Sequence, residues 1–113
     1  MKTYYRQGDV IYMDFSPAIG NEIQGMRPAV VVSSDNFNRY SNYLMVVPVT
    51  NHGNDSGDYV ELNGYRNVHG RVNTAQVHCF SVERAGSTPM DQLRVKDFNM
   101  VMRGIKSIMK TVM

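Results

Sequence analysis

Three polar side chains lie beside apolar runs of the sequence, and their types suit chemistry on a phosphate group. Arg27 precedes the run PAVVV, Thr50 ends the run YLMVVPVT, and Glu22 lies in the polar loop before Arg27. A guanidinium can hold two phosphate oxygens at once, and a hydroxyl adds another donor. If the two runs form adjacent antiparallel strands, Arg27 and Thr50 face one site. The set suits cleavage of RNA by its own 2′-hydroxyl, because the substrate supplies the nucleophile and the protein stabilises the charged phosphorane.

The group that moves the proton in such a reaction stays open at this stage. Arginine holds its proton too tightly to exchange it near neutral pH, so Arg27 is assigned charge stabilisation alone. Glu22 is the first candidate for the general base, followed by His52 or His78. Taken singly, each of these side chains is more often a surface or turn residue, so residue types by themselves favour a structural role.

The sequence predicts neither a metal site nor a cofactor site. The three histidines, His52, His69 and His78, are scattered and have no cysteine or carboxylate at ligand spacing. The loop from Gly20 to Gly25 lacks the Lys-Ser/Thr ending of a phosphate-binding loop. Any catalysis is therefore expected to rely on side chains without a cofactor.

The composition predicts one ordinary globular domain covering residues 1–113. Hydrophobic residues make up 42% and charged residues 19%, values that argue against disorder. A formal net charge of +2 is too small to indicate a nucleic-acid partner by itself. No apolar run approaches the ~18 residues of a membrane span, and the N-terminus lacks the apolar run of a signal peptide. We therefore expect a cytoplasmic protein with no membrane association, and we expect its single cysteine, Cys79, to be buried and inert.

The first two-thirds of the chain predicts strands. Runs rich in β-branched and aromatic residues, separated by Gly, Asn and Pro, are typical of a small antiparallel barrel. The pattern favours a mainly β fold with α (α+β), a small barrel of twisted antiparallel strands with a C-terminal helix. The expected strands cover residues 9–15, 28–33, 43–50, 59–62 and 71–80, with helical turns at 35–40 and 89–93.

The tail of the chain carries an apolar stripe with helical spacing. We expect Asp97 to be the N-cap of this helix. Gly104 is expected to permit a close approach to another backbone. The stripe consists of Phe98, Val101, Met102, Ile105, Ile108, Met109 and Val112.

Two motifs and two later positions follow the pattern of a known protein family. The motifs are GDVIYMDFSP at residues 8–17 and GNEIQGMRP at residues 20–28, the second of which matches a G-x-E-x-x-G-x-R-P loop. A later strand ends in Thr50, and Gln76 matches a glutamine further along. This pattern resembles that of the MazF/PemK (also called Kid) toxins of bacterial toxin–antitoxin modules. The resemblance runs from about residue 6 to the C-terminal helix, and the loop motif is its most specific part.

The resemblance implies a fold, an activity and partners. Family members are SH3-like barrels that act as homodimers and cut single-stranded RNA at short sequences without a metal, leaving a 2′,3′-cyclic phosphate and a 5′-hydroxyl. It implies that Arg27 and Thr50 are the catalytic pair and that Glu22 is the family's loop glutamate. A cognate antitoxin with an acidic C-terminal segment would neutralise the protein. The residues expected to contact RNA are Gly20, Gln24, Pro28, His52, Gln76 and His78.

Two positions depart from the family pattern. Ala75 stands where many members have an acidic residue, so target preference will differ if that carboxylate selects a base. His78 stands where some members have a lysine. A histidine binds a phosphate only when it is protonated, so a structural role is favoured for His78 over a role as a ligand.

Two other function classes are compatible with a small barrel. The CcdB toxins share this barrel and poison DNA gyrase without catalysis, acting through an aromatic residue near the C-terminus. The C-terminal residues KSIMKTVM contain no aromatic residue, which disfavours that function. A barrel that only binds RNA is also disfavoured, because the tyrosines are scattered and do not alternate with basic residues along strands.

Overall fold

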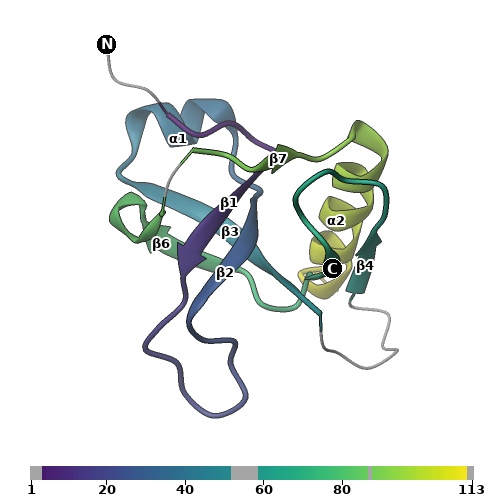
Figure 1. Cartoon of the computed structure of the whole chain (residues 1–113), viewed down its shortest axis with the longest axis horizontal. Coiled ribbons are helices and arrows are strands. Elements are labelled where there is room, and N and C mark those ends of the chain that lie inside the picture. The colour runs from purple at the N-terminus through teal and green to yellow at the C-terminus, as the bar shows by residue number, and fades with distance from the viewer. Residues whose placement is uncertain (1–3, 52–58, 87, 112–113) are drawn as a thin grey trace.

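The computed structural model describes residues 4–51, 59–86 and 88–111. The strands expected at 43–50 and 59–62 and the helix expected at 35–40 are confirmed to the residue. The strands expected at 9–15 and 28–33 are present with shifted ends. In chain order the elements are β1 (Asp9–Asp14), β2 (Met26–Val31), α1 (Asp35–Tyr40), β3 (Tyr43–Thr50), β4 (Tyr59–Leu62), β5 (Gly70–Asn73), β6 (His78–Ser81), the 3-10 helix η1 (Val82–Arg84), β7 (Asp91–Gln92) and α2 (Val95–Ile108) (Figure 1).

The strands form one curled antiparallel sheet. Its order is β4-β5-β3-β2-β1-β7, and β6 pairs with β3 beside this path. Along one side of β3 the neighbour changes, because β6 pairs with it up to Val46 and β5 pairs with it from Val49 onward. Pro48 lies between these two stretches, where the missing N–H of a proline is tolerated. The expected fold class, mainly β with a C-terminal helix, is confirmed.

Each face of the sheet has its own apolar core. Successive residues of a strand point to opposite faces, so Val10 joins one core and Ile11 joins the other. The first core is covered by α2, which contributes Val101 and Ile105. The second core lies within the curl of the sheet, where Phe80 of β6 packs against it. Figure 1 shows α2 beside β4 and shows β6 at the other side of the molecule.

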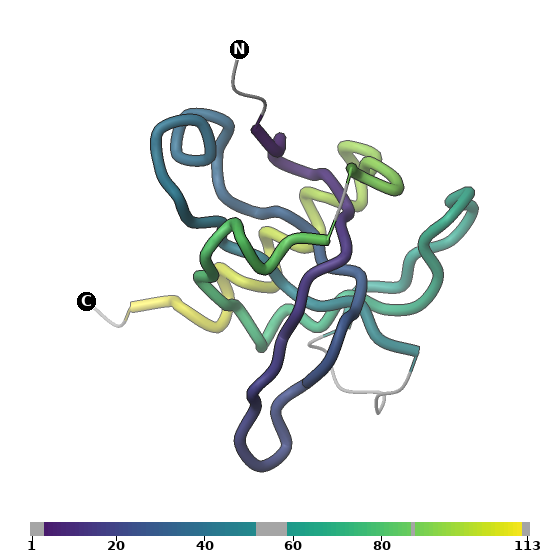
Figure 2. Tube along the Cα trace, turned by 60° about the vertical axis from the view of Figure 1, so that its left-hand side comes forward, coloured from purple at the N-terminus to yellow at the C-terminus, as the bar shows by residue number. Residues whose placement is uncertain are grey.

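The connection between β1 and β2 projects from the body of the molecule, as Figures 1 and 2 show. Ile19, midway along it, is 83% exposed. Loops that project from a rigid sheet frequently carry function. The two strands that hold this loop are therefore the scaffold of the site predicted from the sequence.

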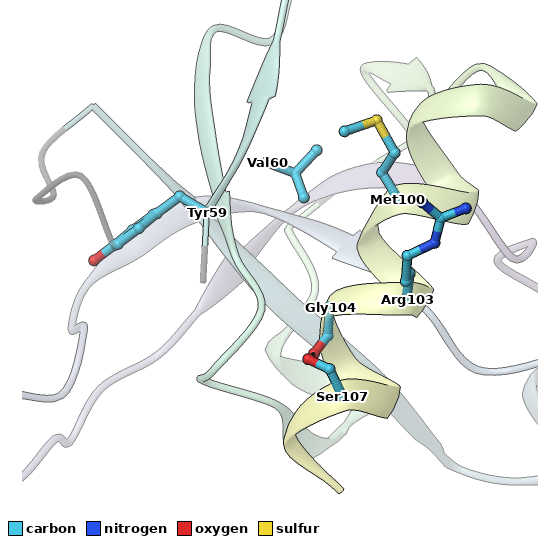
Figure 3. Close-up of a pocket in the computed structure, with 6 residues that line it drawn as sticks. All are labelled: Tyr59, Val60, Met100, Arg103, Gly104 and Ser107. Atoms are coloured by element: carbon cyan, nitrogen blue, oxygen red, sulfur yellow. Dashed lines mark hydrogen bonds between the residues drawn. The ribbon is translucent and has the colours of Figure 1, made fainter. Parts of the chain in front are cut away.

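Helix α2 comes closest to the rest of the chain at Gly104. A Cβ atom at this position would lie 2.9 Å from Thr74 Oγ1 and 3.0 Å from Thr74 Cγ2. Gly104 thus permits a close approach as expected, although the neighbour is a side chain and not a backbone. A hollow of about 300 Å³ lies between β4 and α2 and is lined by Tyr59, Val60, Met100, Arg103, Gly104 and Ser107 (Figure 3).

Two expectations about strands and turns are wrong. The expected strand 71–80 is interrupted after Asn73 and resumes as β6, because its two halves pair with different stretches of β3. The segment 89–93 contains β7 and no helical turn, because Asp91 and Gln92 pair with the start of β1.

The start of α2 also differs from the expectation. Its N-cap is Arg94, and Asp97 lies inside the first turn. The Asp97 carboxylate accepts a hydrogen bond of 2.5 Å from the Tyr65 hydroxyl, so it is used by a tertiary contact. No helix within the described ranges is long and apolar enough to cross a membrane.

The expectation that Cys79 is buried is wrong as well. Residues alternate along β6, and the rings on either side of Cys79, His78 and Phe80, lie 4.8 Å apart by their centroids and pack on the side of Phe15. Cys79 takes the opposite face and is exposed.

Candidate active site

A short network of hydrogen bonds forms the neck of the β1–β2 loop. The Phe15 amide donates to the Gly25 carbonyl at 3.0 Å. In return, the Gly25 amide donates to Ser16 Oγ at 2.8 Å. Gly25 has a φ of +84°, a conformation that other residues rarely adopt. The Ser16 amide donates to Asp14 Oδ1 at 3.0 Å. These residues belong to the two sequence motifs, and their role in the structure is to shape the loop.

Arg84, at the end of η1, supports the same neck. Its Nη1 donates to the Asp14 carbonyl at 3.1 Å and to the Ser16 carbonyl at 2.6 Å. Its guanidinium carbon lies 4.5 Å from the centre of the Phe80 ring. The guanidinium therefore joins the loop to β6 and places a positive charge beside the second core.

Arg27 is the half-buried cation at the start of β2. It pairs with Met13 of β1, so its side chain shares a face with the second core. Its Nε donates to the Gln24 carbonyl at 2.9 Å. No carboxylate in the described part of the chain forms an ion pair with Arg27, and its two terminal nitrogens have no hydrogen-bond partner there. One nitrogen thus orients the guanidinium, and the planar fork makes no hydrogen bond within the described residues.

Thr50 ends β3 on the same face of the sheet. The last pair of residues between β2 and β3 is Ala29 with Pro48. If the same register continues for two more residues, Arg27 lies opposite Thr50. Thr50 is 7% exposed. On its other side it pairs with Arg71, whose Nε lies 3.2 Å from Glu61 Oε2. The expected proximity of Arg27 and Thr50 therefore agrees with the strand register.

Gln76 and His78 approach the loop from the β5–β6 connection. Gln76 Oε1 accepts a hydrogen bond from the Ile23 amide at 3.1 Å. The Gln76 carbonyl lies 2.9 Å from His78 Nδ1. The His78 ring stands edge-on to Phe15, with centroids 5.2 Å apart. Gln76 thus contacts the segment that leads into Arg27, and His78 contacts the residue that follows β1.

The remaining predicted site residues lie in or next to the loop. Glu22 is exposed, and its Oε1 accepts a hydrogen bond from the Ile19 amide at 2.8 Å. Gly20 is exposed with a φ of +62°. Gln24 is exposed and serves Arg27 through its carbonyl, and Pro28 is half-buried opposite Tyr12. His52 lies outside the described residues.

Sequence reasoning did not single out Phe15, Arg71 or Arg84 as parts of this region. Phe15 belongs to the GDVIYMDFSP motif, so its motif position was an available signal. Arg84 lies 68 residues from Ser16, and no local pattern marks that contact. Within the described ranges no group of three or more His, Cys, Asp and Glu side chains could hold a metal ion.

Comparisons with known sequences point to one family. A family model described as PemK-like, MazF-like toxin of type II toxin-antitoxin system matches residues 6–109. Endoribonuclease toxin ChpB of Escherichia coli (strain K12) is 30% identical over 99 residues, which cover 87% of this chain and 74% of ChpB. Endoribonuclease MazF of Staphylococcus saprophyticus is 42% identical over 45 residues, which cover 40% of this chain and 38% of that protein.

Solved structures share the fold. A crystal structure of MazF from Deinococcus radiodurans has a TM-score of 0.89 at 20% identity, covering 97% of this chain and 100% of that one. An endoribonuclease in complex with its cognate antitoxin from a mycobacterial species has a TM-score of 0.81 at 16% identity, covering 96% of this chain and 98% of that one. At such identities the likeness shows the fold alone. Because the family model spans nearly the whole described chain, the protein belongs to the PemK-like, MazF-like toxins of type II toxin–antitoxin systems.

Proposed function

We propose that this endoribonuclease toxin cuts single-stranded RNA by in-line attack of the 2′-hydroxyl on the neighbouring phosphate, without a metal. Arg27 holds the scissile phosphate, and Thr50 adds a donor to it. The observation that carries the proposal is the state of the Arg27 guanidinium. Its Nε is fixed by the Gln24 carbonyl, while its two terminal nitrogens have no partner among the described residues.

The geometry suits stabilisation of the transition state. The terminal nitrogens of Arg27 can donate to two non-bridging phosphate oxygens in parallel, a geometry that arginine offers and lysine lacks. Negative charge on these oxygens grows as the pentacoordinate phosphorane forms, so donors fixed beforehand act more strongly on the transition state than on the substrate. The products are a 2′,3′-cyclic phosphate and a 5′-hydroxyl.

The rest of the RNA runs along the loop and the β5–β6 connection. Backbone and side-chain groups of the loop face the strand near the cut, and we propose that Glu22, whose carboxylate accepts the Ile19 amide, positions this loop. Positioning of the RNA is assigned to Gly20, Gln24, Pro28, His52, Gln76 and His78. Their polar groups and small or rigid backbones allow a single strand to lie close to the sheet.

Control of such a toxin requires that a partner cover the same site. We propose that an acidic segment of the cognate antitoxin lies on the Arg27 fork and competes with the phosphate for it, because a carboxylate matches the fork as well as a phosphate does. The protein acts as a homodimer in the cytoplasm, with one surface used twice. Tyr43, which is 52% exposed at the start of β3, is a candidate for that surface.

Mapping of the cut ends tests the proposed reaction. The purified chain is incubated with a long RNA in excess EDTA, and the ends are mapped by their reactivity. We expect cleavage to persist and to leave cyclic phosphate ends. A matched substrate with a single 2′-deoxy nucleotide at the cut site is expected to stay intact, because it lacks the nucleophile. Cleavage of that substrate would show that an activated water attacks instead and would overturn the mechanism.

A further inference from the structure

We propose that His78 is the general base that takes the proton from the attacking 2′-hydroxyl. The inference rests on the proposed RNA cleavage and decides a question that the residue types leave open, namely which group moves the proton. Three observations support this role: the orientation of the His78 ring, the packing around it, and its connection to Arg27.

The hydrogen bond at Nδ1 fixes the tautomer of the His78 ring. Nδ1 lies 2.9 Å from the Gln76 carbonyl oxygen. A carbonyl oxygen only accepts, so Nδ1 carries the proton of the neutral imidazole. Nε2 is then the basic nitrogen, and it has no hydrogen-bond partner among the described residues. This is how a histidine is prepared as a proton acceptor, with one nitrogen oriented by a carbonyl and the other left for the substrate.

Aromatic contacts hold the ring in this orientation. The Phe15 ring stands edge-on to His78, with centroids 5.2 Å apart and planes at 86°. On another side the Phe80 ring lies 4.8 Å away, tilted by 31°. Behind Phe80 lies the Arg84 guanidinium, which is held by two loop carbonyls. The ring is half-buried, so it is supported by neighbours and still reaches solvent.

Two paths connect His78 to the phosphate-binding fork of Arg27. Phe15 packs edge-on against His78 and lies just after β1, two residues beyond Met13, the direct partner of Arg27. Residues in such a diagonal position on one face of an antiparallel pair lie about 7–8 Å apart. Phe15 thus packs on His78 and lies diagonally opposite Arg27 on the same face of the sheet.

The second path runs through hydrogen bonds. Gln76, whose carbonyl orients His78, accepts the Ile23 amide through its side chain. The next residue, Gln24, accepts Arg27 Nε. The base and the phosphate-binding group are thus positioned by two short segments joined by the hydrogen bond from Ile23 to Gln76, which suits groups that must act on the same phosphodiester.

Glu22, the rival candidate, has a different environment. Its carboxylate accepts the Ile19 amide at 2.8 Å, and the Glu22 amide returns a bond of 3.2 Å to the Ile19 carbonyl. The carboxylate is thus used to close a turn in an exposed loop. Its role in the reaction is to position the loop.

The proposed step balances with water as the only further reactant. His78 Nε2 takes the 2′-hydroxyl proton while the 2′ oxygen forms its bond to phosphorus. The bond from phosphorus to the 5′ oxygen breaks, and the 5′ oxygen takes a proton from water. The imidazolium returns its proton to the hydroxide so formed, which restores water and the neutral ring.

The rate therefore depends on the neutral form of His78. Of the charged groups around the site, Arg84 packs on the Phe80 ring, Arg27 lies on the same face of the sheet, and the Glu22 and Asp14 carboxylates accept backbone amides of the loop. We expect kcat/KM to rise with pH and then to level off, because only the neutral ring can accept the proton.

Three variants test the assignment on a single-site RNA substrate. His78→Gln should lower the plateau rate by about 10²–10⁴-fold and remove the histidine limb of the pH profile. In His78→Ala, added imidazole should restore cleavage in proportion to its neutral form, a response that a purely structural role would not give. Glu22→Gln should keep the histidine limb. His69→Gln, which changes an exposed histidine between β4 and β5, is the matched control and should behave as the wild type.

The outcomes separate this inference from the proposed function. If the wild type cuts RNA but His78→Gln keeps its rate and pH profile, or His78→Ala shows no imidazole response, His78 is not the base. Loss of the pH limb in Glu22→Gln with its retention in His78→Gln would assign the base to Glu22. Failure of the folded wild type to cut any RNA would overturn the proposed function and this inference together.

Discussion

Arg27 and Arg94 both carry a guanidinium group, but the hydrogen bonds that these two groups make are different. Arg94 donates through Nη1 to the Asn63 carbonyl at 2.9 Å and through Nη2 to the Gly64 carbonyl at 2.8 Å. Its guanidinium carbon also lies 4.2 Å from the centre of the Tyr65 ring. Arg27 by contrast uses only Nε within the described chain.

This difference distinguishes an arginine that stabilises the fold from one that is available to a ligand. Arg94 uses both terminal nitrogens to tie the segment after β4 to the start of α2, and Nη1 also lies 3.3 Å from Asp97 Oδ2. Such an arginine replaces the hydrogen bonds of water with internal ones and so stabilises the fold. An arginine that is oriented by one nitrogen and keeps its fork unused is prepared for a ligand.

The largest expected effect comes from Arg27→Ala. We expect RNA cleavage to fall by about 10²–10³-fold, because one fixed donor to the developing charge is lost. Stability in urea should change by no more than about 1 kcal/mol, because the only hydrogen bond lost within the described residues is that to the Gln24 carbonyl. Single-turnover cleavage and urea denaturation on the same preparation measure both quantities. If Arg27→Ala cuts RNA at the wild-type rate, Arg27 does not act in catalysis. If it unfolds much more easily, Arg27 stabilises the fold as Arg94 does.

Arg94→Ala should show the opposite pattern. We expect a loss of about 1–2 kcal/mol in the free energy of unfolding, because the carbonyls of Asn63 and Gly64 lose charged donors at a partly exposed site. RNA cleavage under folding conditions should stay at the wild-type rate. A shift of the urea midpoint measures the first effect. Full stability with reduced cleavage would show that Arg94 serves the RNA.

Tyr65→Phe should give the smallest change in the free energy of unfolding, and it tests the part of the Arg94 contacts that depends on the Tyr65 hydroxyl. The Tyr65 hydroxyl donates to Asp97 and accepts the Arg94 amide at 2.9 Å, so its loss should cost about 1 kcal/mol.

The same variant should change the alkaline dependence of stability. Burial, and then the hydrogen bond to Asp97, raise the pKa of Tyr65 above its ordinary value. A raised pKa in the folded state stabilises the protein below about pH 10, and this contribution is lost as pH rises through the folded pKa. The urea midpoint should therefore fall less between pH 8 and a pH above 10 in Tyr65→Phe than in the wild type. An unchanged slope would show that the phenol does not contribute.

Local patterns in the sequence determined most of the elements and the principal candidate residues, but they did not predict the break after Asn73 or the strand β7. The alternation of β3 and the stripe of α2 depend on neighbours a few positions away, so they could be read directly. The motif around Arg27 placed its loop, and an antiparallel register was enough to set Arg27 level with Thr50.

Contacts between distant segments were decided only by the tertiary structure. The Ile23 amide meets Gln76 across 53 residues of sequence, and Arg84 reaches the loop neck across 68 residues. The exposure of Cys79 and the packing of His78 against Phe15 likewise depend on how β6 joins β3. No local periodicity encodes such pairs, because they arise only when the fold brings the β1–β2 loop against the β5–β6 connection and η1. The sequence alone therefore determined most of the elements and the candidate arginine, Arg27, whereas the tertiary structure decided which side chains surround it.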